Sequence, residues 1–382
     1  MAGVSSRSVE IDSLADFDTR LADDGARLAG RRRLTGWFVS SVDLRDRTDA
    51  LLAADPRGAV FLGCLFAGSP VDVAERLRSG GALLFPELPD LPFDPYRPRL
   101  YSPEELYGVV DGQRPPYALS PDSTTYAWSR APHGRSLTAD LAATLHDHSI
   151  GGALDDATEG LDPTRVVGVM GGHAVRRSDP AYAATARLGA GLTRAGRTVL
   201  TGGGPGAMEA ANLGAYLSGW DDALPEALAQ LAGAPGWADG VDAWADAALA
   251  VRARWSGDQA GRSISIPTWF YGHEPTNVFG TAIAKYFANA LREDTLLHRC
   301  RGGIVFAPGS AGTVQEIFQA ANDRFYAVPG SAKAPLVLLG SEHWQSTLPA
   351  WPLLEALSRD SPMAGAVHVV DDPEEALALV TG

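Results

Sequence analysis

Two glycine-rich stretches stand where an apolar run gives way to a helix-type pattern. "TVLTGGGPGAMEAAN" begins at Thr198, and "GGIVFAPGSAGTVQEIFQ" begins at Gly302. A helix start exposes unpaired N–H groups and a partial positive charge, and glycines leave these groups accessible to a phosphate. We therefore predict two phosphate cradles, formed by Gly202, Gly203, Gly204 and Gly206, and by Gly309, Ser310, Gly312 and Thr313. The alternative is that these glycines only make tight turns.

An acidic side chain lies close to the second predicted cradle. Glu316 follows Thr313 by three residues, so a helix beginning at Thr313 would hold this carboxylate in its first turn. Cleavage of a ribose–base bond builds positive charge on the sugar, which a carboxylate can stabilise while it positions a water. We therefore predict Glu316 as a catalytic residue. The same Thr-x-x-Glu spacing also suits a capping box, and the two roles are compatible.

A cation is expected to meet the phosphate or the leaving base. In a predicted helix over 276–299, Lys285, Asn289 and Arg292 fall at i, i+4 and i+7 on one face. We predict Arg292 as the second catalytic residue. A solvated charge on an amphipathic helix is the structural alternative, and the substitutes are Arg299 and Arg301.

A further turn follows the apolar run "VVGVM". It contains Gly172 and His173, and Arg176 and Arg177 come shortly after. These residues are candidates to contact the phosphate or the base. Ordinary loop polarity is the alternative interpretation.

A dinucleotide site is the competing interpretation of the first glycine stretch. Gly202, Gly204 and Ala207 satisfy GxGxxG/A, but this fingerprint belongs after the first strand, with an acidic residue ending the next. Here it follows the second strand, and Asp221 and Asp222 stand in helical sequence. A redox dinucleotide enzyme is therefore disfavoured, and the chain contains no GxxxxGK[ST] motif.

The elements that position these turns follow a regular alternation from residue 164 onward. Short apolar runs alternate with helical patterns, which predicts a Rossmann-like, doubly wound parallel α/β sheet with helices on both faces. All the glycine turns then fall at the carboxyl edge of the sheet, where ligands bind in such folds. Before it, residues 1–160 predict a smaller α/β unit with an extended, proline-rich connector. The expected division is 1–160 and 161–382.

Composition excludes several classes of function. The 382 residues carry a formal charge of −14, which argues against nucleic acid as a partner. The N-terminal sequence shows no leader pattern and no window suits a membrane span, so a cytoplasmic location is expected. Cys64 and Cys300 form no ligand pattern, so no metal site is predicted.

The glycine motifs together resemble the Lonely-guy (LOG) family of nucleotide 5′-monophosphate nucleosidases. The family marks are GGGxxGxM and PGGxGTxxE. The first is matched by Gly202, Gly203, Gly204, Met208 and by Gly206 or its neighbour Ala207, and the second by Pro308, Gly309, Gly312, Thr313 and Glu316. Ser310 replaces a glycine, and an ungapped register from Pro308 puts Glu293 where the family has its arginine, one residue after Arg292.

This resemblance implies hydrolysis of a nucleoside 5′-monophosphate to free base and ribose 5-phosphate. It also implies a homodimer or a larger homo-oligomer, and we expect no metal or redox cofactor. The alternative, favoured by Ser310 and the shifted arginine, is a sensor or carrier that binds a phosphorylated nucleotide or cofactor without cleaving it.

Overall fold

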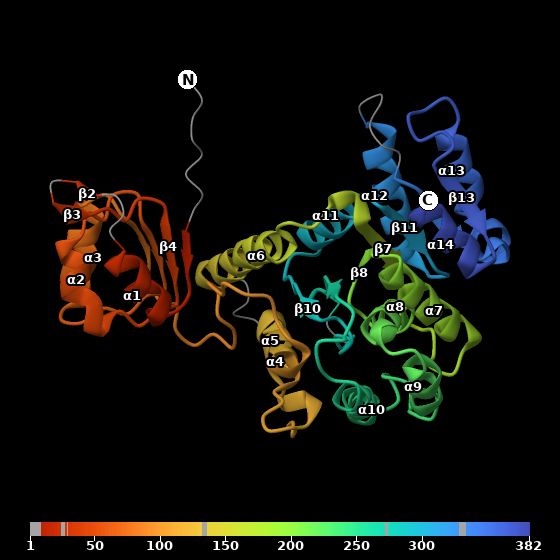
Figure 1. The fold of residues 1–382 in the computed structure, drawn as a ribbon, viewed down its shortest axis with the longest axis horizontal. Coiled ribbons are helices and arrows are strands. Elements are labelled where there is room, and N and C mark those ends of the chain that lie inside the picture. The colour runs from red at the N-terminus through yellow and green to blue at the C-terminus, as the bar shows by residue number, and fades with distance from the viewer. Residues whose placement is uncertain (1–8, 24–26, 29, 132–135, 272–273, 328–333) are drawn as a thin grey trace. The chain divides into compact units, whose positions relative to one another are not determined.

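A computed structural model describes residues 9–23, 27–28, 30–131, 136–271, 274–327 and 334–382 of the protein (Figure 1). The chain forms two compact units. The first unit contains residues 1–99 and 133–154, and the second unit contains residues 100–132 and 155–382. This division differs from the expected boundary near residue 160, because the chain enters the second unit at residue 100 and then returns to the first.

The first unit is a small parallel α/β fold. Its four-stranded sheet has the order β1-β4-β5-β6, and its core includes Phe17, Trp37 and Phe61. Its elements are β1 (Val9–Ile11), α1 (Leu14–Ala22), β2 (Arg27–Leu28), β3 (Arg31–Arg32), β4 (Trp37–Ser40), α2 (Thr48–Ala53), β5 (Val60–Leu62), α3 (Pro70–Ser79), β6 (Leu83–Phe85) and most of α6 (Leu137–Thr158). The expected smaller α/β unit is confirmed.

The second unit is built on a seven-stranded parallel sheet in the order β10-β9-β8-β7-β11-β12-β13. The strands are β7 (Val166–Met170), β8 (Thr198–Thr201), β9 (Ser263–Ser265), β10 (Ala282–Ile283), β11 (Gly303–Phe306), β12 (Leu336–Leu339) and β13 (Val367–Val370). The chain runs outward from β7 to β10 and then crosses to β11 on the other side of β7. The switch point therefore lies between β7 and β11.

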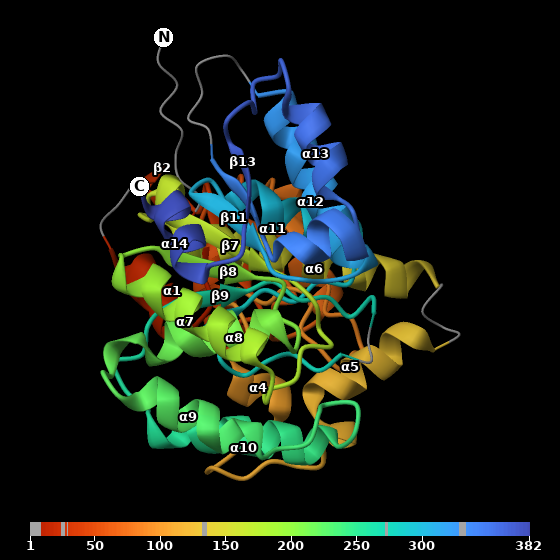
Figure 2. The ribbon, with the colours of Figure 1, turned by 90° about the vertical axis from the view of Figure 1, so that its right-hand side faces the viewer.

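Helices cover both faces of this sheet, which confirms the predicted doubly wound fold (Figure 2). One group contains α7 (Pro180–Arg194), α8 (Ala207–Tyr216) and α14 (Pro373–Thr381), and the other contains α11 (Asn289–Arg299), α12 (Ala311–Phe325) and α13 (Trp351–Ser358). The strands β7, β9, β11 and β12 are buried along their whole length. Two-sided cover favours continuous apolar strands such as β12, whereas β9 buries Ser263 and Ser265.

The predicted helix over 276–299 is wrong in its first half. Only α11 is helical there, whereas Ala282 and Ile283 form β10 beside β9. Pairing with the sheet overrides the helical spacing of the apolar residues. The segment that begins with Asp221 and Asp222 forms two helices, α9 (Ala223–Ala232) and α10 (Val241–Arg254).

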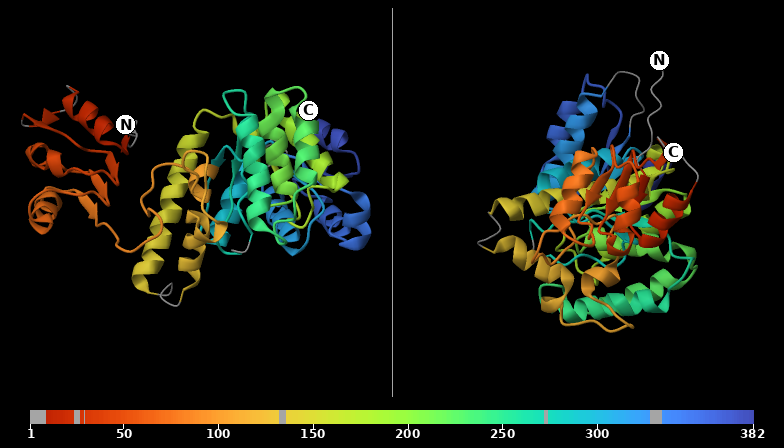
Figure 3. Two further views of the ribbon diagram at one scale, coloured as in Figure 1. Left: turned by 90° about the horizontal axis from the view of Figure 1, so that it is seen from below. Right: turned by 90° about the vertical axis from the view of Figure 1, so that its left-hand side faces the viewer.

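The proline-rich connector contains two helices, contrary to the expected extended conformation. These are α4 (Pro103–Tyr107) and α5 (Pro121–Arg130), which belong to the second unit (Figure 3). Ser102 and Ser120 cap them, and each proline occupies the first turn, where its missing N–H costs nothing.

A buried ion pair fixes α5 to the sheet. Lys285 Nζ donates to Asp122 Oδ1 at 2.6 Å and to Thr276 Oγ1 at 2.8 Å. Trp269 Nε1 and the Tyr117 hydroxyl also donate to this carboxylate. Both charged side chains are at most 3% exposed, so the segment 100–132 completes the core of the second unit.

Candidate functional site

Three turns meet at the carboxyl edge of the sheet, after β7, β8 and β11. The Gly172 N–H donates to the Pro308 carbonyl at 3.0 Å, and the Ala207 N–H donates to the Gly172 carbonyl at 3.1 Å. The strands are parallel and adjacent, so their ends bring these turns together. This confirms that the fold gathers the glycine turns at one edge.

A cavity of about 350 Å³, which we call the glycine pocket, opens beside these turns. Its lining comes from 171–173, 292–293, 310–313 and 315–316, with Met208, Tyr271 and Glu274. The structure thus brings most of the predicted site residues to one cavity: Gly172, His173, Met208, Arg292, Ser310, Gly312, Thr313 and Glu316.

The start of α12 forms one wall of the glycine pocket. This helix begins at Ala311, with Ser310 as its N-cap residue, and the Ser310 side chain makes no cap hydrogen bond. The first N–H groups of a helix have no partner within the helix, so they are available at this wall. A Cβ added at Gly312 would meet nothing within 4 Å. The helix start is therefore open to a ligand.

The expected helix start at Thr313 is wrong by two residues. With α12 beginning at Ala311, Glu316 lies in the second turn rather than the first. The capping-box interpretation therefore fails, because a residue in the second turn cannot bond back to the N-cap backbone. The Glu316 carboxyl instead faces Arg292, at 3.6 Å between Oε1 and Nη1.

The turn after β8 supports the site from behind. The Gly202 carbonyl accepts a hydrogen bond from Arg292 Nη2 at 3.1 Å. Asn277 donates to the Gly203 carbonyl from its backbone N–H and to the Gly204 carbonyl from its side-chain amide. A Cβ at Gly206 would lie 2.3 Å from the Gly172 carbonyl oxygen. These four glycines do not line the glycine pocket. The Gly309 carbonyl is bonded to His343 Nε2 at 2.9 Å, also outside that lining.

Arg292 is a buried cation whose nitrogens all have protein partners. Nε donates to the Ile266 carbonyl at 2.7 Å, and Nη1 contacts Glu293 Oε1 at 2.5 Å. With its bond to Gly202, this guanidinium joins α11, β9 and the turn after β8. Arg292 is thus not a solvated charge on a helix surface. Of the two residues expected on the same helical face, Asn289 begins α11, three residues before Arg292, whereas Lys285 precedes the helix.

Glu316 and Glu293 form the acidic floor of the glycine pocket. Burial raises the pKa of Glu316 to about 8, because desolvation, together with the nearby Glu293, outweighs the attraction of Arg292. The Glu316 carboxyl is therefore protonated at neutral pH. Glu293 Oε2 has no hydrogen-bond partner among the described residues.

His173 lines both the glycine pocket and a second cavity. Its Nδ1 lies 3.0 Å from Glu274 Oε1, and this contact raises the pKa of the imidazole. On the other side is a cavity of about 470 Å³, which we call the tryptophan pocket, lined by 173–178, 205–206, Glu209 and residues 232 and 234–239, with Trp244. Gly206 therefore lines the second cavity rather than the first.

Sequence reasoning missed six residues of the glycine pocket, three of them with polar or ionisable side chains close to Arg292 or His173 in the lining: Tyr271, Glu274 and Glu293, besides Gly171, Ala311 and Gln315. Glu293 was considered only as the residue in the family's arginine position. Glu274 and Tyr271 lie in the segment between β9 and β10, which the predicted helix had partly absorbed. Placing the segment after β9 at the same sheet edge as the glycine turns would have pointed to them.

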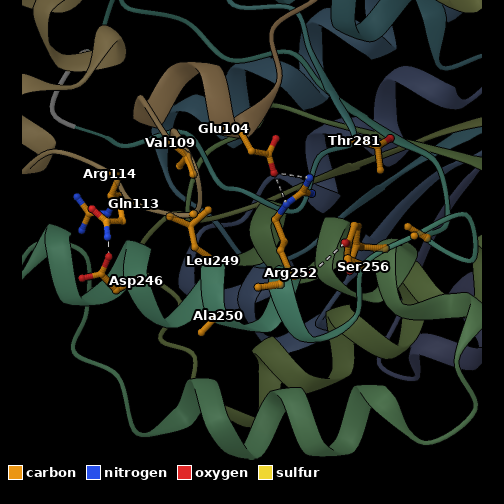
Figure 4. Close-up of a pocket in the computed structure, with 15 residues that line it drawn as sticks. Glu104, Val109, Gln113, Arg114, Asp246, Leu249, Ala250, Arg252, Ser256 and Thr281 are labelled. Atoms are coloured by element: carbon orange, nitrogen blue, oxygen red, sulfur yellow. Dashed lines mark hydrogen bonds and ion pairs between the residues drawn. The ribbon is translucent and has the colours of Figure 1, made fainter.

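A larger cavity of about 940 Å³ lies elsewhere in the second unit, between α10 and the segment after α4 (Figure 4). Its arginines are paired with carboxylates: Arg252 contacts Glu104 at 3.0 Å, and Arg114 contacts Asp246 at 2.8 Å. None of the predicted site residues lines it. The glycine pocket is therefore the candidate site.

In the described part of the chain, none of the helices has the length and apolar character needed to cross a membrane. Within the same residues, no three His, Cys, Asp or Glu side chains are grouped to hold a metal ion.

Comparisons with known proteins give a likeness of fold. No family model and no curated protein matches the chain. It is similar to a molybdenum cofactor binding protein from the phototrophic bacterium Rippkaea orientalis, at 18% identity and a TM-score of 0.35. Two structures of the molybdenum cofactor carrier protein from Chlamydomonas reinhardtii show 20% and 22% identity, with TM-scores of 0.35 and 0.34. Each match covers 56% of this chain and 94% of the other.

The prediction of a nucleosidase is wrong. The similar structures are described as proteins that bind or carry a cofactor, and none of the three is described as a nucleosidase.

Proposed function

We propose that the protein binds a phosphorylated nucleotide or cofactor without cleaving it, as a sensor or carrier. The phosphate is held by the backbone N–H groups at the start of α12. The observation that carries this proposal is the open helix start in the glycine pocket, where Ser310 makes no cap bond and the space beside Gly312 is empty. A helix N-terminus with free N–H groups favours an anion.

The surrounding charges support binding rather than catalysis. The Arg292 guanidinium already bonds to Glu293 and to two backbone carbonyl groups. It therefore fixes the wall of the pocket and is not free to act as a catalytic acid. The neutral Glu316 carboxyl is a hydrogen-bond donor at pH 7 and does not repel a phosphate.

The motif resemblance supports the choice of a phosphate monoester as ligand. The residues that match PGGxGTxxE include Gly312, Thr313 and Glu316, which line the glycine pocket. By the same resemblance we expect a homo-oligomer, which the mass of the protein in solution tests.

The experiment measures binding of ribose 5-phosphate and adenosine 5′-monophosphate by calorimetry. Gly312→Asp puts a carboxylate into the empty space beside the helix start. Asp is favourable in a first helical turn, so the fold should be retained. Repulsion between two charges about 4 Å apart is worth several kcal/mol near a protein surface, so we expect at least about 100-fold weaker binding.

Gly312→Asn is the matched control, because it has the same shape without the charge. We expect it to bind at least tenfold more tightly than Gly312→Asp. Equal affinities in the two variants, or no binding of either phosphate by the unmodified protein, would contradict the proposed site. Chromatography of the same mixtures should show no released base.

A further inference from the structure

The tryptophan pocket lies next to the glycine pocket and shares His173 with it. Its walls come from the segment after β7, the turn at Pro205 and Gly206, and the loop between α9 and α10. At about 470 Å³ it falls within the size range of small-molecule sites. The phosphate site described above uses none of these walls except His173.

A buried ion pair lies at the base of the tryptophan pocket. Arg177 Nη2 contacts Glu209 Oε1 at 2.5 Å, and both side chains are at most 4% exposed. The Arg177 guanidinium also lies 4.6 Å from the Trp244 ring centroid and donates to the Trp244 carbonyl. The charges of this buried pair cancel, so this wall is not a second anion site.

The rim carries planar and polar groups. Trp237 stands edge-to-face with His173, at 6.1 Å between ring centroids, and its Nε1 donates to the His173 carbonyl at 3.3 Å. Arg176 is exposed, and its guanidinium makes no ion pair within the described residues. Asp239 is exposed on the same rim and offers acceptor oxygens.

We infer that the tryptophan pocket holds the planar nitrogen heterocycle of a ligand whose phosphate occupies the glycine pocket. Trp237 and Arg176 supply flat faces for stacking, and Asp239 accepts hydrogen bonds from ring N–H or amino groups. Indole and guanidinium faces are the groups on which heterocycles stack in proteins. This inference rests on the proposed function, since it places the second half of the same ligand.

The two cavities favour a ligand with two distinct parts. The glycine pocket offers a helix start and carboxyl groups but one aromatic side chain, Tyr271. The tryptophan pocket offers two tryptophans and the Arg176 guanidinium, which makes no ion pair among the described residues, and the first N–H of α8, at Ala207, is already bonded to Gly172. The ring and the phosphate therefore have separate places, in two cavities that share His173.

The test compares ribose 5-phosphate, which lacks a ring, with adenosine 5′-monophosphate and flavin mononucleotide, by calorimetry on the full chain. We expect at least one of the ring-bearing ligands to bind at least about tenfold more tightly than ribose 5-phosphate. Trp237→Ala should abolish this advantage and leave the affinity for ribose 5-phosphate within about twofold. Arg176→Gln should reduce the advantage in the same direction.

Trp237→Phe keeps an aromatic face but loses the indole donor, so it should retain most of the advantage. Thermal unfolding of each variant checks the fold. Ribose 5-phosphate binding without any gain from either ring would overturn this inference and leave the proposed function intact. A complete lack of phosphate binding would overturn both. Equal losses for all three ligands in Trp237→Ala, with the Phe variant unaffected, would assign Trp237 to the phosphate site instead.

Discussion

At the scale of single residues, the charges in the glycine pocket depend on which of two carboxyl groups the buried Arg292 guanidinium contacts. Arg292 faces both Glu293 and Glu316, but its short contact is to Glu293, at 2.5 Å against 3.6 Å for Glu316. Because the guanidinium contacts Glu293 directly, it would not fully neutralise a negative charge on Glu316. The pKa of Glu316 is therefore raised, and its carboxyl keeps its proton at neutral pH.

This charge state makes stability depend on pH. The folded pKa of Glu316, about 8, lies above its ordinary value of 4.5, so folding takes up a proton between these pH values. Stability therefore falls as pH rises through this window. Glu316→Gln removes the proton uptake and should gain stability relative to the unmodified protein by up to about 1.4 kcal/mol per pH unit. Urea unfolding between pH 5 and 8 measures this difference.

Glu342→Gln is the control for the Glu-to-Gln substitution itself, because the Glu342 side chain is exposed. A constant difference between Glu316→Gln and the unmodified protein across the range would mean that the carboxyl is ionised when folded.

Two glycines near the site differ in what they tolerate. Gly206 has a φ of +72°, and an added Cβ would lie 2.3 Å from the Gly172 carbonyl oxygen, whereas Gly312 has open space. We expect Gly206→Ala to cost at least about 2 kcal/mol of unfolding free energy. Gly312→Ala should be neutral or stabilising by up to about 1 kcal/mol. Denaturant unfolding of the two variants, side by side, checks the contrast; similar losses would refute it.

At the scale of elements, local sequence predicts strands and turns better than it predicts helix bounds here. The glycines after β7, β8 and β11 were readable because an apolar run, a glycine turn and a helical pattern recur in order. The start of α12 was missed because Thr-x-x-Glu imitates a cap, while Ser310 is the N-cap residue. The strand β10 was missed because its pairing partner, β9, lies about 18 residues away in sequence.

The ion pair between α5 and the segment that follows β10 also cannot be predicted from the local sequence. Lys285 was interpreted as a helical surface charge, yet it is buried against Asp122. Removal of one partner from a buried pair leaves an uncompensated charge. We expect Asp122→Asn and Lys285→Met each to cost about 3–5 kcal/mol.

The double variant should cost less than the sum by at least about 1 kcal/mol, because both charges are then removed. Urea unfolding of all four proteins gives this coupling energy. Strictly additive losses would show that the pair does not act as a unit.

At the scale of the whole molecule, the second unit is assembled from two separate parts of the chain. Residues 100–132 contribute Asp122 and Tyr107, whose hydroxyl donates to the Thr276 carbonyl at 2.6 Å. A cut at residue 160, as the sequence had suggested, would remove both. The boundary between units is therefore a property of packing rather than of chain order.

Two fragments test this consequence. A fragment of residues 100–382 should keep a cooperative urea transition, because it retains the partners of Lys285 and Thr276. A fragment of residues 161–382 should lose several kcal/mol of stability or fail to fold, since Lys285 is left charged and buried. Near-ultraviolet circular dichroism follows the tertiary packing of both. A fully stable shorter fragment would show that α4 and α5 are dispensable.

The wide separation of the ion-paired residues also affects how the chain is made. Asp122 and Lys285 are 163 positions apart. At translation speeds of roughly 5–20 residues per second, Asp122 leaves the ribosome about 8–33 s before its partner. During that interval the nascent α5 segment has no ammonium group to neutralise it. We expect it to stay hydrated until Lys285 is synthesised, by which time β7, β8, β9 and β10 have been translated but β11, β12 and β13 have not.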